Sequence, residues 1–200
     1  LLDFLEIVFV KTPWFVIICF IVLLTGLSAG GRTAIISASF LAYIGLLGFW
    51  EKAMTTLALL GTAACLSILI GIPLGMYCAR RDRFYSVIRP IMDFMQTMPA
   101  FVFMIPVIAF FGTGKPAAVV TTMIFGGTPV VRLTVLGLRG VPENVREAAI
   151  SYGASKWYLL TKVDLPLAAP SIRAGVNQTI MLSLAMVVVA SLIGAKGLGE

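Results

Sequence analysis

The stretch "VREAAISYGASKWYLLTKVDLPLAAP", residues 145–170, lies between two long apolar runs and carries charges, a central glycine and two prolines. Just upstream, residues 141–143 (Val-Pro-Glu) are typical of a helix start, because a first-position proline sacrifices no hydrogen bond and a carboxylate there favours the helix dipole. Gly153 predicts a left-handed cap that ends this helix. A second helical segment is expected to begin at Ser155 and to end before Leu165-Pro166, because the residue before a proline resists the helical conformation.

The apolar runs around this stretch indicate an integral membrane protein. The chain has 200 residues, of which 60% are hydrophobic and 12% charged, and its mean hydropathy is +1.02. A helical crossing needs about 20 apolar residues, and the continuous runs favour helices over the alternating pattern of a barrel. We therefore expect an all-α, polytopic transmembrane helical bundle. The six predicted spans are residues 14–29, 33–49, 54–78, 95–112, 117–137 and 171–194.

The basic residues predict the orientation of these spans. Residues 80–94, which we expect to form a loop, contain four arginines, and loops rich in Lys and Arg stay in the cytoplasm. Alternation of the spans then places eleven of the fifteen basic residues inside. The four outside are Lys11, Lys52, Lys115 and Lys196. Residues 145–170 are thus predicted to be cytoplasmic, and topology explains the net charge of +6 better than nucleic-acid binding does.

Residues with catalytic or metal-binding chemistry are sparse. The chain has no histidine, and its three cysteines lie in apolar runs without metal-ligand spacing, so we expect no metal site. The glycine-rich residues 194–199 (GAKGLG) lack the Ser or Thr that follows the lysine of a P-loop. We also expect no charged residue well inside the six spans, and hence no carboxylate relay for an ion gradient. The energy for any transport is therefore expected to come from a partner subunit.

Residues 147–166 carry a spaced pattern: Glu-Ala-Ala, three residues, Gly153, nine residues, then Val-Asp-Leu-Pro. On periodicity alone, an amphipathic helix at the lipid interface is an equal alternative. The whole pattern, however, resembles the EAA loop of permease subunits in ATP-binding cassette importers. In that family the loop docks on a cytoplasmic ATPase subunit and couples it to the membrane helices. The resemblance implies a coupling loop at about residues 138–169, with contacts at Glu143, Arg146, Glu147, Ala148, Ala149, Gly153, Leu165 and Pro166.

The resemblance extends over residues 54–200. This part of the chain is similar to the glycine betaine and proline branch of the family, most specifically at residues 93–106 and 175–188. It implies a type I importer permease fold, a homodimer in the bacterial cytoplasmic membrane, two ATPase subunits that bind ATP and Mg, and an extracytoplasmic substrate-binding protein. The chain itself is then expected to hold no cofactor and to catalyse no reaction. Residues 1–53 are expected to be a variable amino-terminal addition.

Polar residues in the spans are candidates for the translocation path, although hydrogen bonding between helices explains them about as well. They are Gln96, Thr97, Met98, Pro99, Thr128, Pro129, Asn177, Gln178 and Ser183. We expect Pro73, Pro99, Pro106 and Pro129 to kink or break their helices. Two other functions stay open at this point: an ion-coupled carrier or channel for small solutes, and a membrane scaffold that transports nothing.

Overall fold

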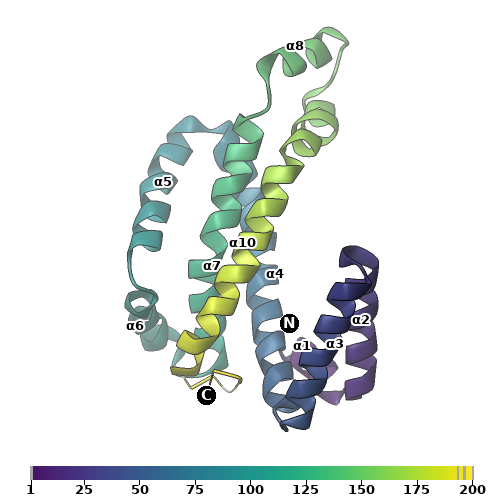
Figure 1. Cartoon of the computed structure of the whole chain (residues 1–200). Coiled ribbons are helices and arrows are strands. Elements are labelled where there is room, and N and C mark those ends of the chain that lie inside the picture. The colour runs from purple at the N-terminus through teal and green to yellow at the C-terminus, as the bar shows by residue number, and fades with distance from the viewer. Residues whose placement is uncertain (1, 193, 196, 200) are drawn as a thin grey trace.

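Three long helices form the centre of the molecule. The computed structural model describes residues 2–192, 194–195 and 197–199, and the regular elements found among these residues are helices. Helices α4 (Trp50–Arg80), α7 (Lys115–Arg139) and α10 (Leu165–Leu192) pack against one another along most of their length (Figure 1). The predicted all-α bundle is confirmed, and the buried residues concentrate in this three-helix core.

Small residues allow the three core helices to approach closely. A Cβ atom added at Gly75 of α4 would lie 2.7 Å from Cβ of Thr134 on α7. A Cβ at Gly126 of α7 would lie 2.7 Å from Oγ of Ser183 on α10. Because lipid offers helices no hydrophobic drive to associate, such close backbone packing supplies much of the attraction between them. The glycines therefore determine how tightly the core closes.

The region between α4 and α7 differs from the prediction. Residues 80–94 are not a loop, because only Arg81 separates the end of α4 from helix α5 (Asp82–Thr97). The predicted span 95–112 is also wrong as a single helix: α5 and α6 (Ala100–Phe111) meet at an angle of 104°. Met98 is extended (ψ 143°) because it precedes Pro99, and an extended residue interrupts the helix.

The amino-terminal helices are shorter than a full crossing. After α1 (Leu2–Lys11), helices α2 (Trp14–Ala29) and α3 (Gly31–Leu46) form a hairpin through Gly30, whose φ is +87°. Both lie where spans were predicted, but each has 16 residues and is about 24 Å long at 1.5 Å per residue. The hydrocarbon core of a bilayer is about 30 Å thick, so neither helix reaches across it when upright.

The chain returns to the membrane through a continuous helix. Helix α8 (Glu143–Ser151) is followed by α9 (Lys156–Tyr158), a π-helical segment η1 (Leu159–Asp164) and α10. The prediction that this helix ends before Leu165-Pro166 is wrong. The N–H of Leu165 donates to the carbonyl of Leu160, a π-type bond, and this wider turn accommodates the proline that lacks an N–H.

The number of candidate membrane spans is smaller than the six predicted. In the described part of the chain, three helices are long and apolar enough to cross a membrane: Trp50–Arg80, Lys115–Arg139 and Lys156–Leu192. The bent pair α5 and α6 would make a fourth if it counts as one span. Only Pro99 among the four expected prolines lies at a break, and the others stay within α4, α6 and α7. Ile193, in the last predicted span, lies outside the described residues.

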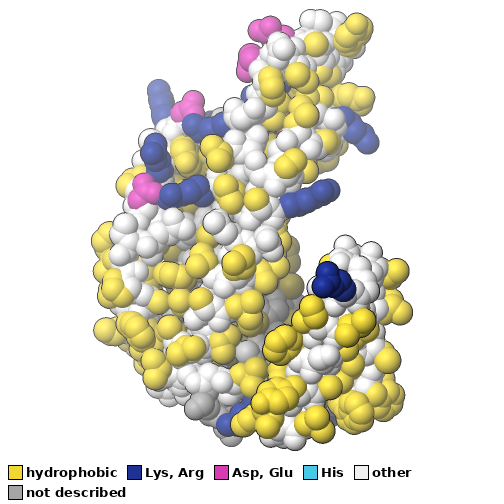
Figure 2. All heavy atoms as spheres, viewed as in Figure 1, with side chains coloured by type: hydrophobic (Ala, Val, Ile, Leu, Met, Phe, Trp, Pro, Cys, Tyr) yellow, Lys and Arg dark blue, Asp and Glu magenta, His cyan; other side chains and the backbone are white. Residues whose placement is uncertain are grey.

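The helix termini that carry basic residues lie mostly at one end of the bundle. Helices α4 and α7 end, and α5 and α10 begin, at the end that carries α8, and the α2–α3 turn points the same way (Figure 1). Figure 2 shows that most of the charged side chains on the visible face lie towards this end, and that hydrophobic side chains are numerous over the rest. The Arg139 guanidinium lies 2.8 Å from the Asp82 carboxylate and joins α7 to α5 there. This arrangement agrees with the predicted alternation, except that Lys196 lies outside the described residues.

Candidate functional site

Helix α8 projects beyond the membrane-spanning core and is open to contact (Figure 1). None of its nine residues is buried. The Glu147 side chain is exposed and forms no ion pair with any described residue. Tyr152, directly after the helix, is 93% exposed. A short, uncovered helix with a free carboxylate is suited to docking on another protein, because it presents its side chains without first breaking contacts within the chain.

Gly153 ends α8 as predicted. Its φ is +82°, its N–H donates to the carbonyl of Ile150 (2.8 Å), and the N–H of Ala154 donates to the carbonyl of Ala149 (3.0 Å). These two bonds are those of a Schellman cap, in which a left-handed glycine satisfies the last carbonyls of the helix. The predicted left-handed cap is confirmed. It turns the chain sharply back towards the membrane.

The return segment begins at the predicted residue. The Ser155 hydroxyl accepts a hydrogen bond from the N–H of Tyr158 (3.2 Å), so Ser155 is the N-cap of the helix that leads into α10. Trp157 is 73% exposed on this first turn. From Lys156 the helix then continues through η1 into α10, and the turn at residues 152–155 separates it from α8.

Arg146 connects α8 to the segments that lie before and after it in the chain. Its Nε donates to Asp164 Oδ1 (2.8 Å) and one terminal nitrogen donates to the Leu138 carbonyl (2.6 Å). The other terminal nitrogen lies 3.8 Å from the Glu143 carboxylate. Arg146 and Asp164 side chains are 25% and 10% exposed, so this pair is partly buried. Arg146 therefore joins α8 to α7 and to η1, the segment that leads into α10, and its guanidinium is directed inward rather than outward.

Asp164 is a site residue that the sequence did not single out. It lies in the Val-Asp-Leu-Pro end of the spaced pattern, but nothing in the pattern tells which partner it has. Only the fold brings it to Arg146, 18 residues earlier. Of the other predicted coupling residues, Ala148 is exposed, Ala149 and Leu165 are half-buried and Pro166 is exposed at the start of α10. The predicted coupling residues are thus divided between α8 with its cap and the start of α10.

Three of the predicted path residues lie inside the helical core. Thr128, Pro129 and Ser183 are buried between α7 and its neighbours. The Thr128 hydroxyl donates to the Ile124 carbonyl in its own helix (3.3 Å). Ser183 packs against Gly126, and its hydroxyl has no hydrogen-bond partner within the described residues. Their surroundings are those of packing contacts between helices.

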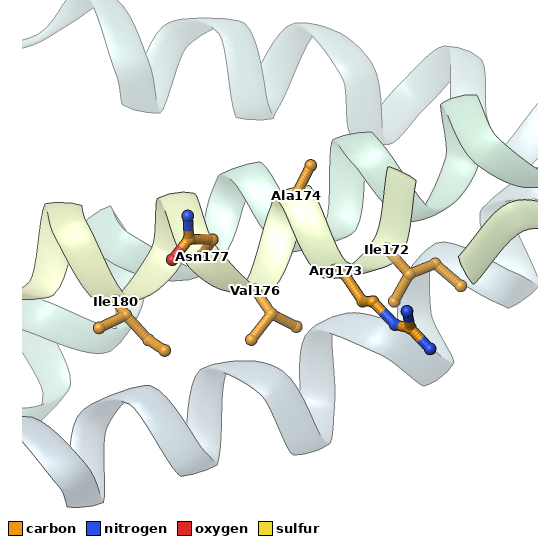
Figure 3. A pocket seen from close by; sticks show the side chains of 6 residues that line it. All are labelled: Ile172, Arg173, Ala174, Val176, Asn177 and Ile180. Atoms are coloured by element: carbon orange, nitrogen blue, oxygen red, sulfur yellow. The ribbon is translucent and has the colours of Figure 1, made fainter. Parts of the chain in front are cut away.

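Asn177 and Gln178 are instead exposed on α10. Asn177 borders an open hollow along this helix, and Figure 3 shows it on the same side as Ala174, whereas Arg173, Val176 and Ile180 point the other way. The exposed amides lie along a helix whose opposite face is buried against α7. They are therefore available to a solute or to another polypeptide.

The segment from Gln96 to Pro99 forms the sharp bend between α5 and α6. Gln96, Thr97 and Pro99 are exposed and Met98 is half-buried. The Thr97 hydroxyl donates to the Phe94 carbonyl (3.0 Å), which helps to close the last turn of α5. The structure thus places the four residues together, but at a distance along the chain from the exposed amides of α10.

An ion pair joins α5 and α7 where none was expected. Arg132 is seven residues before the end of α7, about 10 Å along the helix, and pairs with Asp93 of α5. Their side chains are 38% and 47% exposed. This pair was not predicted, because Asp93 was assigned to the end of a loop and Arg132 to the end of a span.

The comparisons with known proteins identify the family. Residues 71–200 match the model of the binding-protein-dependent transport system inner membrane component. The chain belongs to this family. The match starts in the middle of α4 and covers α7, α8 and α10, the elements that build the core and the projecting helix.

Curated relatives within this family include three osmolyte permeases. The glycine betaine/proline betaine transport system permease protein ProW of Escherichia coli (strain K12) is 52% identical over 157 residues, 78% of this chain and 44% of that protein. The glycine betaine/carnitine transport permease protein GbuB of Listeria monocytogenes is 49% identical, over 76% of this chain and 54% of that protein. The trimethylamine N-oxide transport system permease protein TmoV of Pelagibacter ubique is 40% identical, over 94% of this chain and 26% of that protein. The chain thus spans about half or less of these relatives.

A solved structure supports the fold. The chain is similar to a chain of the MetNI methionine ABC transporter in an inward-facing conformation, with a TM-score of 0.64 and 22% sequence identity. The likeness covers 72% of this chain and 73% of the other. The type I permease fold that the sequence predicted is therefore confirmed.

Proposed function

We propose that this chain is a permease subunit of an ATP-driven importer for a small betaine-type solute. The observation that carries the proposal is α8: an exposed helix, capped at Gly153 and held through Arg146 to α7 and to η1, which continues into α10. Force applied to such a helix reaches two core helices at once. The family membership and the osmolyte permeases among the relatives support both the class of machine and the class of solute.

The remaining parts would be supplied by other subunits. Two ATPase subunits would bind ATP and Mg and dock on α8, an extracytoplasmic binding protein would deliver the solute, and a second copy of this chain would complete the path. The chain would then carry no catalytic group of its own. Closing of the ATPase pair would draw the two α8 helices together and turn the cavity outward.

The test is uptake of radiolabelled glycine betaine by the full-length protein, assembled with its ATPase and binding protein in proteoliposomes. We expect uptake to require ATP, and we expect Glu147→Lys to abolish uptake while ATP hydrolysis continues. Glu51→Lys, the same charge change in the first turn of α4 at the opposite end of the bundle, is the matched control and should leave uptake intact. Unchanged uptake in Glu147→Lys would contradict docking on α8.

The same preparation separates the alternatives. Uptake that persists without ATP while an ion gradient is held would indicate a secondary carrier. Absence of solute flux in the complete complex would indicate a scaffold. We favour the ATP-driven importer because α8 is exposed yet joined to the core by the hydrogen bonds of Arg146, a combination that neither alternative requires.

A further inference from the structure

Helix α5 has three distinct faces. One is a polar stripe at helical spacing that runs its whole length: Asp82, Ser86, Arg89, Asp93 and Gln96. These residues recur at intervals of three and four, so they lie one above another on one side of the helix. Asp93 is half-buried and the others are exposed. A helix that reaches into a membrane thus has a continuous polar side.

The other two faces of α5 are apolar and have different surroundings. Ile88, Met92 and Met95 line a hollow shared with α4 and α7, so this face is turned to the core. Val87 and Phe94 lie on the side opposite the polar stripe and are 60% and 59% exposed. Large exposed apolar side chains suit contact with lipid. The lipid-facing side is therefore already assigned, and the polar stripe must face something else.

The stripe is joined to α7 by two ion pairs. Asp82 pairs with Arg139 at the end of α7, and Asp93 pairs with Arg132 further inside. Arg89 adds a second cation, with its Nε 3.9 Å from Asp93. The inner cluster therefore has two guanidinium groups around one carboxylate. Nε of Arg132 is buried without a hydrogen-bond partner among the described residues.

The half-exposed charges of Asp93 and Arg132 indicate what this side of α5 faces. Charged side chains within membrane segments are costly in lipid and mark water-filled paths or polar partners. Asp93 and Arg132 retain 47% and 38% exposure, so their pairing does not shield them from what lies outside this chain. Figure 2 shows side chains of both charge signs close together over the upper part of α5. A lipid contact for this side would leave both charges in hydrocarbon.

We propose that the polar stripe of α5, together with Arg132, forms a wall of the aqueous translocation path, and that the Asp93–Arg132 pair is a transient binding site for a small zwitterion. This inference rests on the proposed function, and it assigns residues to a path that the exposed bend at Gln96 also borders. The solute carboxylate would lie against Arg132 and Arg89, and its cationic group against Asp93. Each charged group of the solute then lies beside a protein group of opposite sign, and the Asp93–Arg132 pair does not have to separate.

The charge balance of the cluster predicts its selectivity. Two guanidinium groups and one carboxylate leave an excess of positive charge, so a cation without a carboxylate is repelled while a zwitterion is accepted. A half-exposed site binds weakly, because water screens the charges, and weak binding suits a path through which solute must also leave. The site would therefore discriminate against solutes that lack an acidic group.

Cysteine accessibility tests the position of the stripe. The full-length protein in membrane vesicles, with Cys19→Ala and Cys65→Ala, would carry one new cysteine and be treated with a membrane-impermeant thiol reagent. We expect Gln96→Cys and Ser86→Cys to react, and the matched lipid-facing variants Phe94→Cys and Val87→Cys to stay unlabelled. Glycine betaine should slow labelling at Gln96→Cys. Equal labelling of both faces, or none at the stripe, would overturn the proposed path wall.

Uptake kinetics test the binding site. We expect Arg132→Gln and Asp93→Asn each to raise the KM for glycine betaine about tenfold with little change in maximal rate. Arg132→Gln would weaken the charge-assisted hydrogen bond to the solute carboxylate, and Asp93→Asn would remove the Coulomb attraction to its trimethylammonium group. Arg83→Gln, on α5 but outside the stripe, is the control. A fall in maximal rate with unchanged KM would reduce the pair to a structural contact and overturn the site. Labelling of the stripe without ATP-dependent uptake would support the path wall and contradict only the proposed function.

Discussion

Gly153 is held in a conformation that few other residues adopt. Its φ of +82° costs an L-residue about 1–2 kcal/mol, most of all a β-branched one. We expect Gly153→Val to destabilise the end of α8 and to lower ATP-driven uptake strongly. Gly153→Asn, which tolerates this conformation, should retain most activity. The measurement is uptake at equal amounts of assembled complex, and equal activity of the two variants would show that the cap is not required.

Arg146 and Asp164 form a partly buried pair that is expected to hold α8 in place. Removing either partner leaves the other charge unpaired, which costs about 3 kcal/mol in a buried site. We expect Arg146→Leu and Asp164→Leu each to speed amide hydrogen exchange across residues 143–151, and the double variant to be less affected than the two single effects combined. Additive effects would show that the two side chains act independently. Arg83→Leu, on an exposed part of α5, serves as the control for loss of an arginine.

At the scale of the helix, glycine positions decide how α4 meets α7. A side chain at Gly75 would collide with Thr134, whereas Gly61 of the same helix has open space around it. Overpacking of this kind costs about 1–3 kcal/mol or more. We expect Gly75→Leu to lower the thermal unfolding temperature of the detergent-purified protein. Gly61→Leu is the matched control and should change it little; a similar loss in both would mean that the effect is one of helix propensity or lipid contact.

Helix positions were largely predictable, and the errors have specific causes. The charges of residues 80–94 suggested a loop, but Asp82, Arg89 and Asp93 recur at helical spacing, so α5 carries these three on one side. Pro166 suggested a helix end, but the π-type turn of η1 removes the need for its N–H. In contrast, Gly153 and Ser155 were correctly predicted as caps, because a cap depends on its own few residues and not on distant contacts.

At the scale of the whole molecule, the ends of α4 and α7 and the starts of α5 and α10 lie near α8, so all four should be on the same side of the membrane. We expect Ser151→Cys, in α8, to react with an impermeant thiol reagent only from the cytoplasmic side. Thr113→Cys, exposed between α6 and α7 at the opposite end, should react only from the outside. Labelling in intact and inverted vesicles, in a background with Cys19 and Cys65 replaced, distinguishes the two. Reaction of both from one side would contradict the arrangement of α7.

The candidate site was predicted in part, and the division follows the range of each interaction. The spaced pattern of residues 147–166 located the projecting helix and its turn, since both are built from residues close in sequence. The direction of the Arg146 side chain and the role of Asp164 were not predicted, because they depend on how α8 folds back over α7 and η1. The coupling and path residues themselves stay predictions until the variants above are measured.

Sequence alone determined that this chain is a helical membrane protein, where its polar loop lies and which end carries the positive charge, because hydropathy, caps and loop charges act locally. Tertiary structure decided which charges meet. The Asp93–Arg132 pair joins residues 39 positions apart, and Arg146 joins Asp164 across a turn. Such pairs depend on the close approach of α5, α7 and α10, which the glycines of the core permit but which no single segment specifies.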